Sequence, residues 1–125
     1  MSLHESGQMY LEAIYILSKR SPYVRAIDVG EHLGYSKPSV SRAMSILKRD
    51  GYVLTDENGC LVLTEEGQRV AETMYKRHTV LTRLLTGLGV DAETAAEDAC
   101  RIEHVISEQS FEAMLRHLEK NENSK

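Results

Sequence analysis

Apolar residues recur at helical spacing along most of the chain, and this pattern predicts a mainly α protein. The first such segment predicts a helix over residues 6–20, ending in two basic residues where the helix dipole favours positive charge. A short helix is expected next, with Ile27, Val29 and Leu33 on its buried face and Gly34 as its C-terminal stop.

A third helix and a β-hairpin are predicted to follow. Ser36 suits the N-cap of a helix over residues 36–50, and Pro38 falls in its first turn, where a missing N–H has no consequence. Two β-rich runs, Tyr52–Thr55 and Cys60–Thr64, flank the turn sequence DENG. Helix, short helix, turn, helix and hairpin is the order of a winged helix-turn-helix, so we expect this domain over residues 1–72.

The second half of the chain is predicted to be helical throughout. The pattern favours a long helix over residues 65–87, a helix over 91–106 that Asp91 caps, and a last amphipathic helix over 110–120. We therefore expect a second, helical domain over residues 73–125.

Composition and charge restrict the classes of function that the chain can have. The chain has 125 residues, 42% of them hydrophobic and 27% charged, which is ordinary for a globular protein. It contains neither a membrane-length apolar run nor a signal peptide, so we expect a cytoplasmic protein with no membrane partner and with Cys60 and Cys100 reduced. The net charge of −4 lies entirely in the C-terminal half, because residues 1–64 hold seven acidic and seven basic residues and are therefore neutral. The N-terminal half is therefore compatible with DNA binding.

The polar face of the helix over 36–50 carries the candidate DNA contacts. Arg42 is expected to read a base edge, with a bidentate bond to guanine as the obvious geometry. The small hydroxyls and the lysine near its N-terminal end are expected to contact phosphates, and Pro38 and Ser39 could also meet a thymine methyl group. The candidates are Ser36, Lys37, Pro38, Ser39, Ser41, Arg42 and Lys48. The alternative is a solvated surface helix, against which the preceding helix and following hairpin argue.

A second group of residues has the chemistry of metal ligands. In DACRIEHVISE, a thiol, a carboxylate and an imidazole occur at i, i+3 and i+4, so on a helix they would share one face. Two other predicted helices carry further donors, a Met and a Glu at i, i+3 and a single His. The six candidates are Met9, Glu12, His78, Cys100, Glu103 and His104. Each alone has a plainer explanation as a core or surface residue, so the hypothesis rests on the group.

Four segments carry a family resemblance: MYLEAIYIL, SKPSVSRAMSILKRDGYV, LTEEGQRVAETMYKRHTVLTRLL and DACRIEHVIS. Together they span nearly the whole chain, which resembles the metal-dependent transcriptional repressor family of the diphtheria toxin repressor, the iron-dependent regulators and the manganese transport regulator. The resemblance implies a winged helix-turn-helix DNA-binding domain, a helical metal-binding and dimerisation domain, and a divalent metal as corepressor. It also implies a homodimeric repressor, not an enzyme, that binds a double-stranded DNA operator and controls metal uptake genes.

Residue by residue, the resemblance is mixed. Iron-type members use Met, Cys, Glu and His at the positions of Met9, Cys100, Glu103 and His104, and all four are present. Manganese-type members have acidic residues in place of this methionine and cysteine. The resemblance therefore implies an iron-type primary site, and its sulfur donors favour Fe²⁺, with Mn²⁺ second.

The remaining family positions match the manganese-type members in part and differ from the iron-type members at two ancillary ligands. A Glu and a His matching Glu12 and His78 are ligands in manganese-type members and are present here. The iron-type ancillary site expects a glutamate and a histidine where this chain has Thr82 and Ala96. Because the sequence also ends before the C-terminal SH3-like domain of the longer members, we expect a short form without that domain, binding one or two ions per chain.

We expect metal to control DNA binding, and we expect the chain to form a dimer. Because the candidate ligands come from both halves, metal would fix one half against the other and set the separation of two recognition helices in a dimer. The dimer contact is expected from Val105, Ile106, Phe111, Met114 and Leu115, which could equally fill the chain's own core.

Two other functions are weighed. One is a metal-independent thiol redox regulator using Cys100 or Cys60. The other is a small hydrolase with Cys100 as nucleophile and His104 as base, which is disfavoured because no oxyanion-stabilising glycine loop accompanies them.

Overall fold

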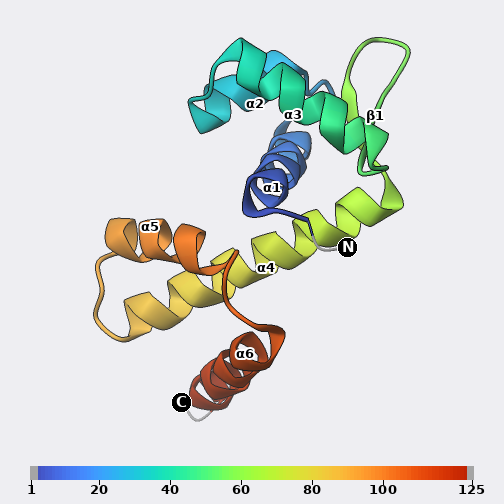
Figure 1. Ribbon diagram of the computed structural model, residues 1–125. Coiled ribbons are helices and arrows are strands. Elements are labelled where there is room, and N and C mark those ends of the chain that lie inside the picture. The colour runs from blue at the N-terminus through green and yellow to red at the C-terminus, as the bar shows by residue number, and fades with distance from the viewer. Residues whose placement is uncertain (1–2, 124–125) are drawn as a thin grey trace. The chain divides into compact units, whose positions relative to one another are not determined.

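The computed structural model describes residues 3–123, which form six helices and one two-stranded antiparallel sheet (Figure 1). The chain divides into two compact units, Met1–Thr73 and Met74–Lys125. The prediction of a mainly α protein with a winged helix-turn-helix at its N-terminus is confirmed.

The first unit contains three helices and the hairpin, and the fourth helix begins in it. In chain order the elements are α1 (Glu5–Arg20), α2 (Ala26–Leu33), α3 (Lys37–Arg49), β1 (Val53–Thr55), β2 (Leu61–Leu63) and the start of α4 (Glu65–Gly87). Helix α1 contacts α2, α3 and β2, and α2 packs against α3. Leu11 and Ile14 of α1 are 0% exposed and join Val29, Leu47 and Val53 in one apolar cluster. Burial of each such side chain contributes about 1.5–3 kcal/mol to the stability of the fold. This cluster therefore holds α3 against α1 and α2.

The predicted inward position of Ile27 is wrong, since this side chain is 50% exposed. Helix α2 begins at Ala26, and its covered face consists of Ala26, Val29, Gly30 and Leu33, at i, i+3, i+4 and i+7. Ile27 lies about 100° around the helix from Ala26 and therefore faces away from the core.

The turn between α2 and α3 has the predicted chemistry. Gly34 has φ 74°, a left-handed conformation that favours glycine, and its N–H donates to the Gly30 carbonyl at 2.8 Å. Ser36 is the N-cap of α3 and accepts a hydrogen bond from the Ser39 N–H at 3.4 Å. Pro38 lies in the first turn of the helix. These residues fix where α3 begins.

The hairpin is held to the segment before α2. Strands β1 and β2 pair with Leu54 opposite Val62. The Leu61 N–H donates to the Val24 carbonyl at 2.7 Å, and the Arg25 guanidinium donates to the Asn58 carbonyl at 2.7 Å. The wing is thus anchored at both its strand and its turn.

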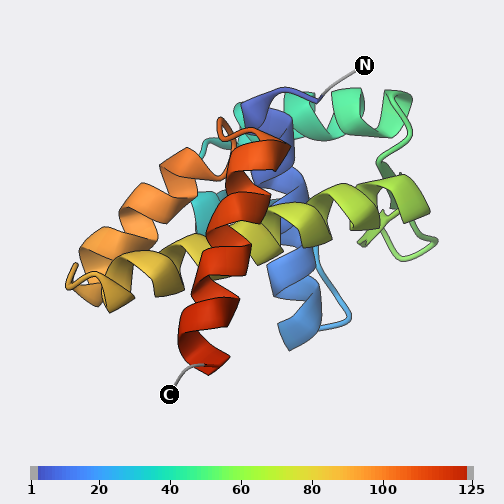
Figure 2. The same cartoon turned by 90° about the horizontal axis from the view of Figure 1, so that it is seen from below.

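The second unit combines the C-terminal part of α4 with α5 (Ala92–Ile102) and α6 (Glu108–Asn123). Helix α5 lies beside α4 in both views (Figure 1 and Figure 2). Ion pairs of Arg77 with Glu108 and of Arg83 with Glu122 join α4 to α6. Within residues 3–123, no helix is both long and apolar enough to cross a membrane.

Candidate metal centre

The candidate ligands near the end of α5 do not form the predicted helical stripe. The helix over 91–106 was predicted too long: α5 ends at Ile102, Glu103 is its C-cap, and His104 lies in the following turn. Cys100 is exposed, whereas Glu103 is 0% exposed. Glu103 keeps helical backbone angles and its N–H donates to the Ala99 carbonyl, so the helical period ends with this residue and does not extend through His104 to Ile106.

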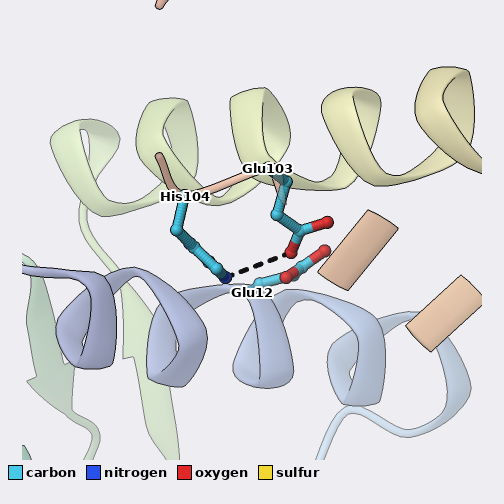
Figure 3. A group of neighbouring side chains, drawn as sticks. All are labelled: Glu12, Glu103 and His104. Carbon is cyan, nitrogen blue, oxygen red and sulfur yellow. Dashed lines mark ion pairs between the residues drawn. The ribbon is translucent and has the colours of Figure 1, made fainter. Parts of the chain in front are cut away.

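Glu103 is instead the centre of a cluster within the second unit. Its Oε2 lies 3.0 Å from Nδ1 of His78 on α4, and its Oε1 lies 3.2 Å from Nε2 of His104. Figure 3 shows the second of these contacts as a dashed line. The side chains of Glu103 and His104 are both 0% exposed, and that of His78 is 31% exposed. The structure thus brings together three of the six predicted ligands.

The cluster is electrostatically coupled. The hydrogen bond to the Glu103 carboxylate raises the pKa of His78 above its ordinary value, partial burial opposes this shift, and Coulombic attraction to the same carboxylate adds to it. A proton and a metal ion therefore compete for this imidazole.

The residues present fit a divalent cation. The Glu103 carboxylate has no exposed surface and so loses its hydration, and a cation beside it would replace part of that lost stabilisation. Two imidazoles and a carboxylate are ligands that Fe²⁺, Mn²⁺ and Zn²⁺ accept. His78, Glu103 and His104 are therefore the residues of this unit that could hold an ion.

The other predicted ligands have different surroundings. Met9 and Glu12 lie on α1 in the first unit, where Met9 is half-buried and Glu12, labelled in Figure 3, is 8% exposed. They are one turn apart on that helix, as their spacing predicts. Cys60, the second thiol, is 1% exposed and is a core residue of the first unit.

One residue that contacts this cluster was missed from the sequence. Arg77, on α4 next to His78, donates from Nη1 to the carbonyl oxygens of Glu103 and Ile106, each at 3.1 Å. Its Nη2 pairs with Glu108 at 2.9 Å. The available signal was its position, because Met74, Arg77 and Leu81 follow one another at i, i+3 and i+7, the spacing of a buried helix face.

All seven predicted DNA contacts are exposed and lie on or just before α3, namely Ser36, Lys37, Pro38, Ser39, Ser41, Arg42 and Lys48. Four of them, Ser36, Lys37, Ser41 and Lys48, line a surface hollow of about 780 Å³. Residues of α2 and of the wing, among them Glu31 and Thr55, complete its walls. The polar face of α3 is thus open and bordered by the wing.

The predicted dimer residues divide between core and surface. Phe111 is 4% exposed, and the Arg77 guanidinium lies 5.5 Å from its ring centroid, so it fills the second unit's own core. Val105 is 73% exposed, and Leu88 is also exposed at 72%.

Two family models match consecutive parts of the chain. The N-terminal DNA binding domain of iron dependent repressors matches residues 2–61. The metal binding and dimerisation domain of iron dependent repressors matches residues 64–124.

Individual relatives agree with these matches. The HTH-type transcriptional regulator MntR of Bacillus velezensis is 31% identical over 123 residues, covering 96% of this chain and 87% of that protein. The diphtheria toxin repressor of Corynebacterium diphtheriae is 31% identical over 117 residues, covering 93% of this chain and 52% of that protein. The structure of the manganese regulator SloR superposes with a TM-score of 0.80 at 28% identity, covering 95% of this chain and 55% of that one. The chain thus spans about half the length of the last two proteins. The thiol redox alternative finds no support in these comparisons.

Proposed function

The chain belongs to the iron-dependent repressor family, and we propose that it is a metal-responsive transcriptional repressor that binds operator DNA as a homodimer. The observation that carries the metal dependence is the buried Glu103 carboxylate, with imidazole nitrogens 3.0 and 3.2 Å from its two oxygens. Residues 1–72 are proposed to read DNA, and residues 73–125 to bind metal and pair with a second copy.

The proposed ligand set extends the cluster in the second unit. Glu103 and His104 are its centre, and His78 ligates from α4. Met9 and Glu12 of α1 are the proposed ligands from the first unit, and their one-turn spacing on α1 supports this role. Cys100 of α5 is proposed as a thiolate ligand by its family match. One or two ions can be accommodated by these donors, since a carboxylate can bridge.

Fe²⁺ is the proposed physiological metal, with Mn²⁺ second. A thioether from Met9 and a thiolate from Cys100 make the donor set softer than an all-oxygen and imidazole site, which favours Fe²⁺ over Mn²⁺. A Cys100→Glu variant replaces the soft donor with a hard one. We expect its Fe²⁺/Mn²⁺ preference, measured anaerobically by competition with a metal-sensitive dye, to shift toward Mn²⁺. An unchanged preference would show that Cys100 is not a ligand.

The proposed switch works through differential affinity. Metal that joins ligands of both units favours one arrangement of the reading unit and the pairing unit, and DNA binding favours the same arrangement. A coupling free energy of about 1–3 kcal/mol, typical of allosteric proteins, changes DNA affinity by about 5- to 150-fold. Arg42 is the proposed base contact, and Lys48 a phosphate contact.

The test begins with protein stripped of metal by a chelator. Duplexes selected from a random library with Mn²⁺, or anaerobically with Fe²⁺, supply the operator sequence. Fluorescence anisotropy on the selected duplex should give at least fivefold tighter binding with metal than with EDTA. Equal binding under both conditions would refute metal control.

A pair of histidine variants then tests the site. His104→Ala should abolish the metal response. His117→Ala is the matched control, because His117 lies exposed on α6 and contacts Asn121 rather than the cluster. A full response in His104→Ala would remove His104 from the ligand set.

A further inference from the structure

Arg77 contacts four residues of one short segment, residues 103–111. Its guanidinium donates to the carbonyl oxygens of Glu103 and Ile106, pairs with Glu108, and lies 5.5 Å from the ring centroid of Phe111. The Arg77 side chain is only 11% exposed. Glu103 and Ile106 lie in the connection between α5 and α6, and Glu108 and Phe111 lie in the first turn of α6, so one buried side chain of α4 contacts both the connection and the helix that follows it.

These contacts explain why the connection has its conformation. A buried main-chain carbonyl needs a hydrogen-bond donor, and the carbonyls of Glu103 and Ile106 lie beyond Ile102, the last residue of α5. Arg77 supplies a donor to both, and its positive charge is balanced by Glu108 at the start of α6. The planar guanidinium can donate to several acceptors at fixed angles, which a lysine ammonium on a flexible stem does less well.

Two adjacent residues of α4 thereby hold Glu103 at two points. Arg77 binds its main-chain carbonyl at 3.1 Å, and His78 lies 3.0 Å from its carboxylate. A cation held by this carboxylate would compete with the contact to His78, whereas it would not compete with the bond from Arg77 to the main-chain carbonyl. Arg77 can therefore keep the backbone of Glu103 and His104 in place with and without metal.

We propose that Arg77 is a positioning residue of the metal centre, which pre-organises the turn that presents Glu103 and His104 to the ion. The inference rests on the proposed metal-binding function. Groups that orient metal ligands without touching the ion commonly change metal affinity by 10- to 100-fold when they are removed.

The experiment compares Arg77→Met with Arg83→Met in the full chain. Arg83 is the matched control, because it also lies on α4 and pairs with a glutamate of α6, Glu122, but contacts no residue of the α5–α6 connection in the hydrogen bonds and ion pairs of residues 3–123. Free Mn²⁺ measured by electron paramagnetic resonance gives the Kd of each variant without DNA. We expect the Kd to rise about 10- to 100-fold in Arg77→Met and to stay within about twofold in Arg83→Met.

A second readout separates positioning from general destabilisation. At saturating Mn²⁺ the correct turn is restored by the ion itself, so the DNA affinity of Arg77→Met should return to within about threefold of the wild type. If both variants lose thermal stability equally and keep the wild-type Kd for Mn²⁺, the role of Arg77 is only structural and the inference is wrong.

Further variants keep the test decisive. If Arg77→Met does not fold, as judged by far-UV circular dichroism, Arg77→Lys replaces it and should give a smaller rise in Kd. Glu108→Gln removes the ion pair but leaves both carbonyl bonds, so its Kd should change less than that of Arg77→Lys. A wild-type Kd in Arg77→Lys, or a larger effect of Glu108→Gln, would overturn the proposal. If the wild type itself binds no Mn²⁺, the proposed function fails instead.

Discussion

Gly67, in the first turn of α4, is predicted to be intolerant of alanine. A Cβ built on it would lie 2.1 Å from the carbonyl oxygen of Tyr52 and 3.0 Å from the carbonyl carbon. The clashing atoms are backbone, so no rotamer change can relieve the contact. The same oxygen accepts the Thr64 N–H at 3.1 Å, and Thr64 caps this turn by accepting the Gly67 N–H at 3.1 Å. The first turn of α4 therefore packs directly against the backbone of Tyr52, just before β1.

The change in the free energy of unfolding is the sum of one stabilising and two destabilising effects. Alanine in a helix interior is favoured over glycine by about 0.8–1 kcal/mol. Relief of the overlap with Tyr52 requires a backbone movement of about 1 Å, and overpacking of this kind typically costs about 1–3 kcal/mol. Loss of the hydrogen bond from Thr64 adds about 1 kcal/mol. We therefore expect Gly67→Ala to lower the free energy of unfolding by about 1–3 kcal/mol.

Gly87 supplies a matched control in the same helix. It is the last residue of α4, and a Cβ there meets nothing within 4 Å. Gly87→Ala should leave the stability unchanged or raise it by up to about 1 kcal/mol. Urea unfolding followed by far-UV circular dichroism measures both variants. If Gly67→Ala is as stable as the wild type, the close approach of Tyr52 to α4 is not a property of the folded protein.

Four further outcomes are expected. Arg42→Ala should relax specificity at one base pair by about 1–3 kcal/mol, seen by anisotropy on single-substitution duplexes. Lys48→Ala should instead reduce the slope of log K against log salt by about 1. A hydrogen bond from the Thr94 N–H lowers the pKa of Asp91, so this cap stabilises the fold above the ordinary carboxyl pKa. The Tm advantage of the wild type over Asp91→Ala should therefore vanish as the pH falls through the lowered pKa. Mn²⁺ at 100 times its Kd should stabilise the chain by about 2.7 kcal/mol, and His104→Ala should remove this gain.

Helix starts could be predicted closely because their signals are local. The long helix was expected over residues 65–87, and α4 spans Glu65–Gly87. The caps Ser36 and Asp91 both accept the expected hydrogen bonds from the N–H groups three residues on. A side-chain oxygen that bonds within its own turn needs no tertiary partner, so sequence suffices.

The end of α5 could not be predicted for the opposite reason. No glycine or proline follows Ile102, and the apolar pattern continues through Val105 and Ile106. The helix ends where Arg77, more than twenty residues earlier in the chain, binds the carbonyls of the turn. A stop signal from so distant a residue is absent from any local window of sequence.

Part of the candidate site could likewise be predicted from the sequence, and part could not. The residue types and family matches named Glu103, His104 and His78 as ligands, and the structure brings these three together. The sequence did not reveal that Cys100 is exposed while Glu103 is fully buried, because exposure depends on which distant parts of the chain cover each side chain. An arginine within a helix usually indicates a solvated surface, and only the buried positions around Arg77 indicate otherwise.

The partners of Glu103 within the second unit explain why this carboxylate suits a reversible metal site. Arg77 carries a permanent positive charge, yet it binds the carbonyl of Glu103 and the carboxylate of Glu108 rather than the carboxylate of Glu103. A direct arginine–carboxylate pair would be a charge-assisted, bidentate interaction that a metal ion would have to displace. Instead, the carboxylate has the imidazoles of His78 and His104 beside it, and a neutral imidazole is itself a common metal ligand. The two imidazoles beside Glu103 are thus suited to become ligands of the same ion that this carboxylate would hold.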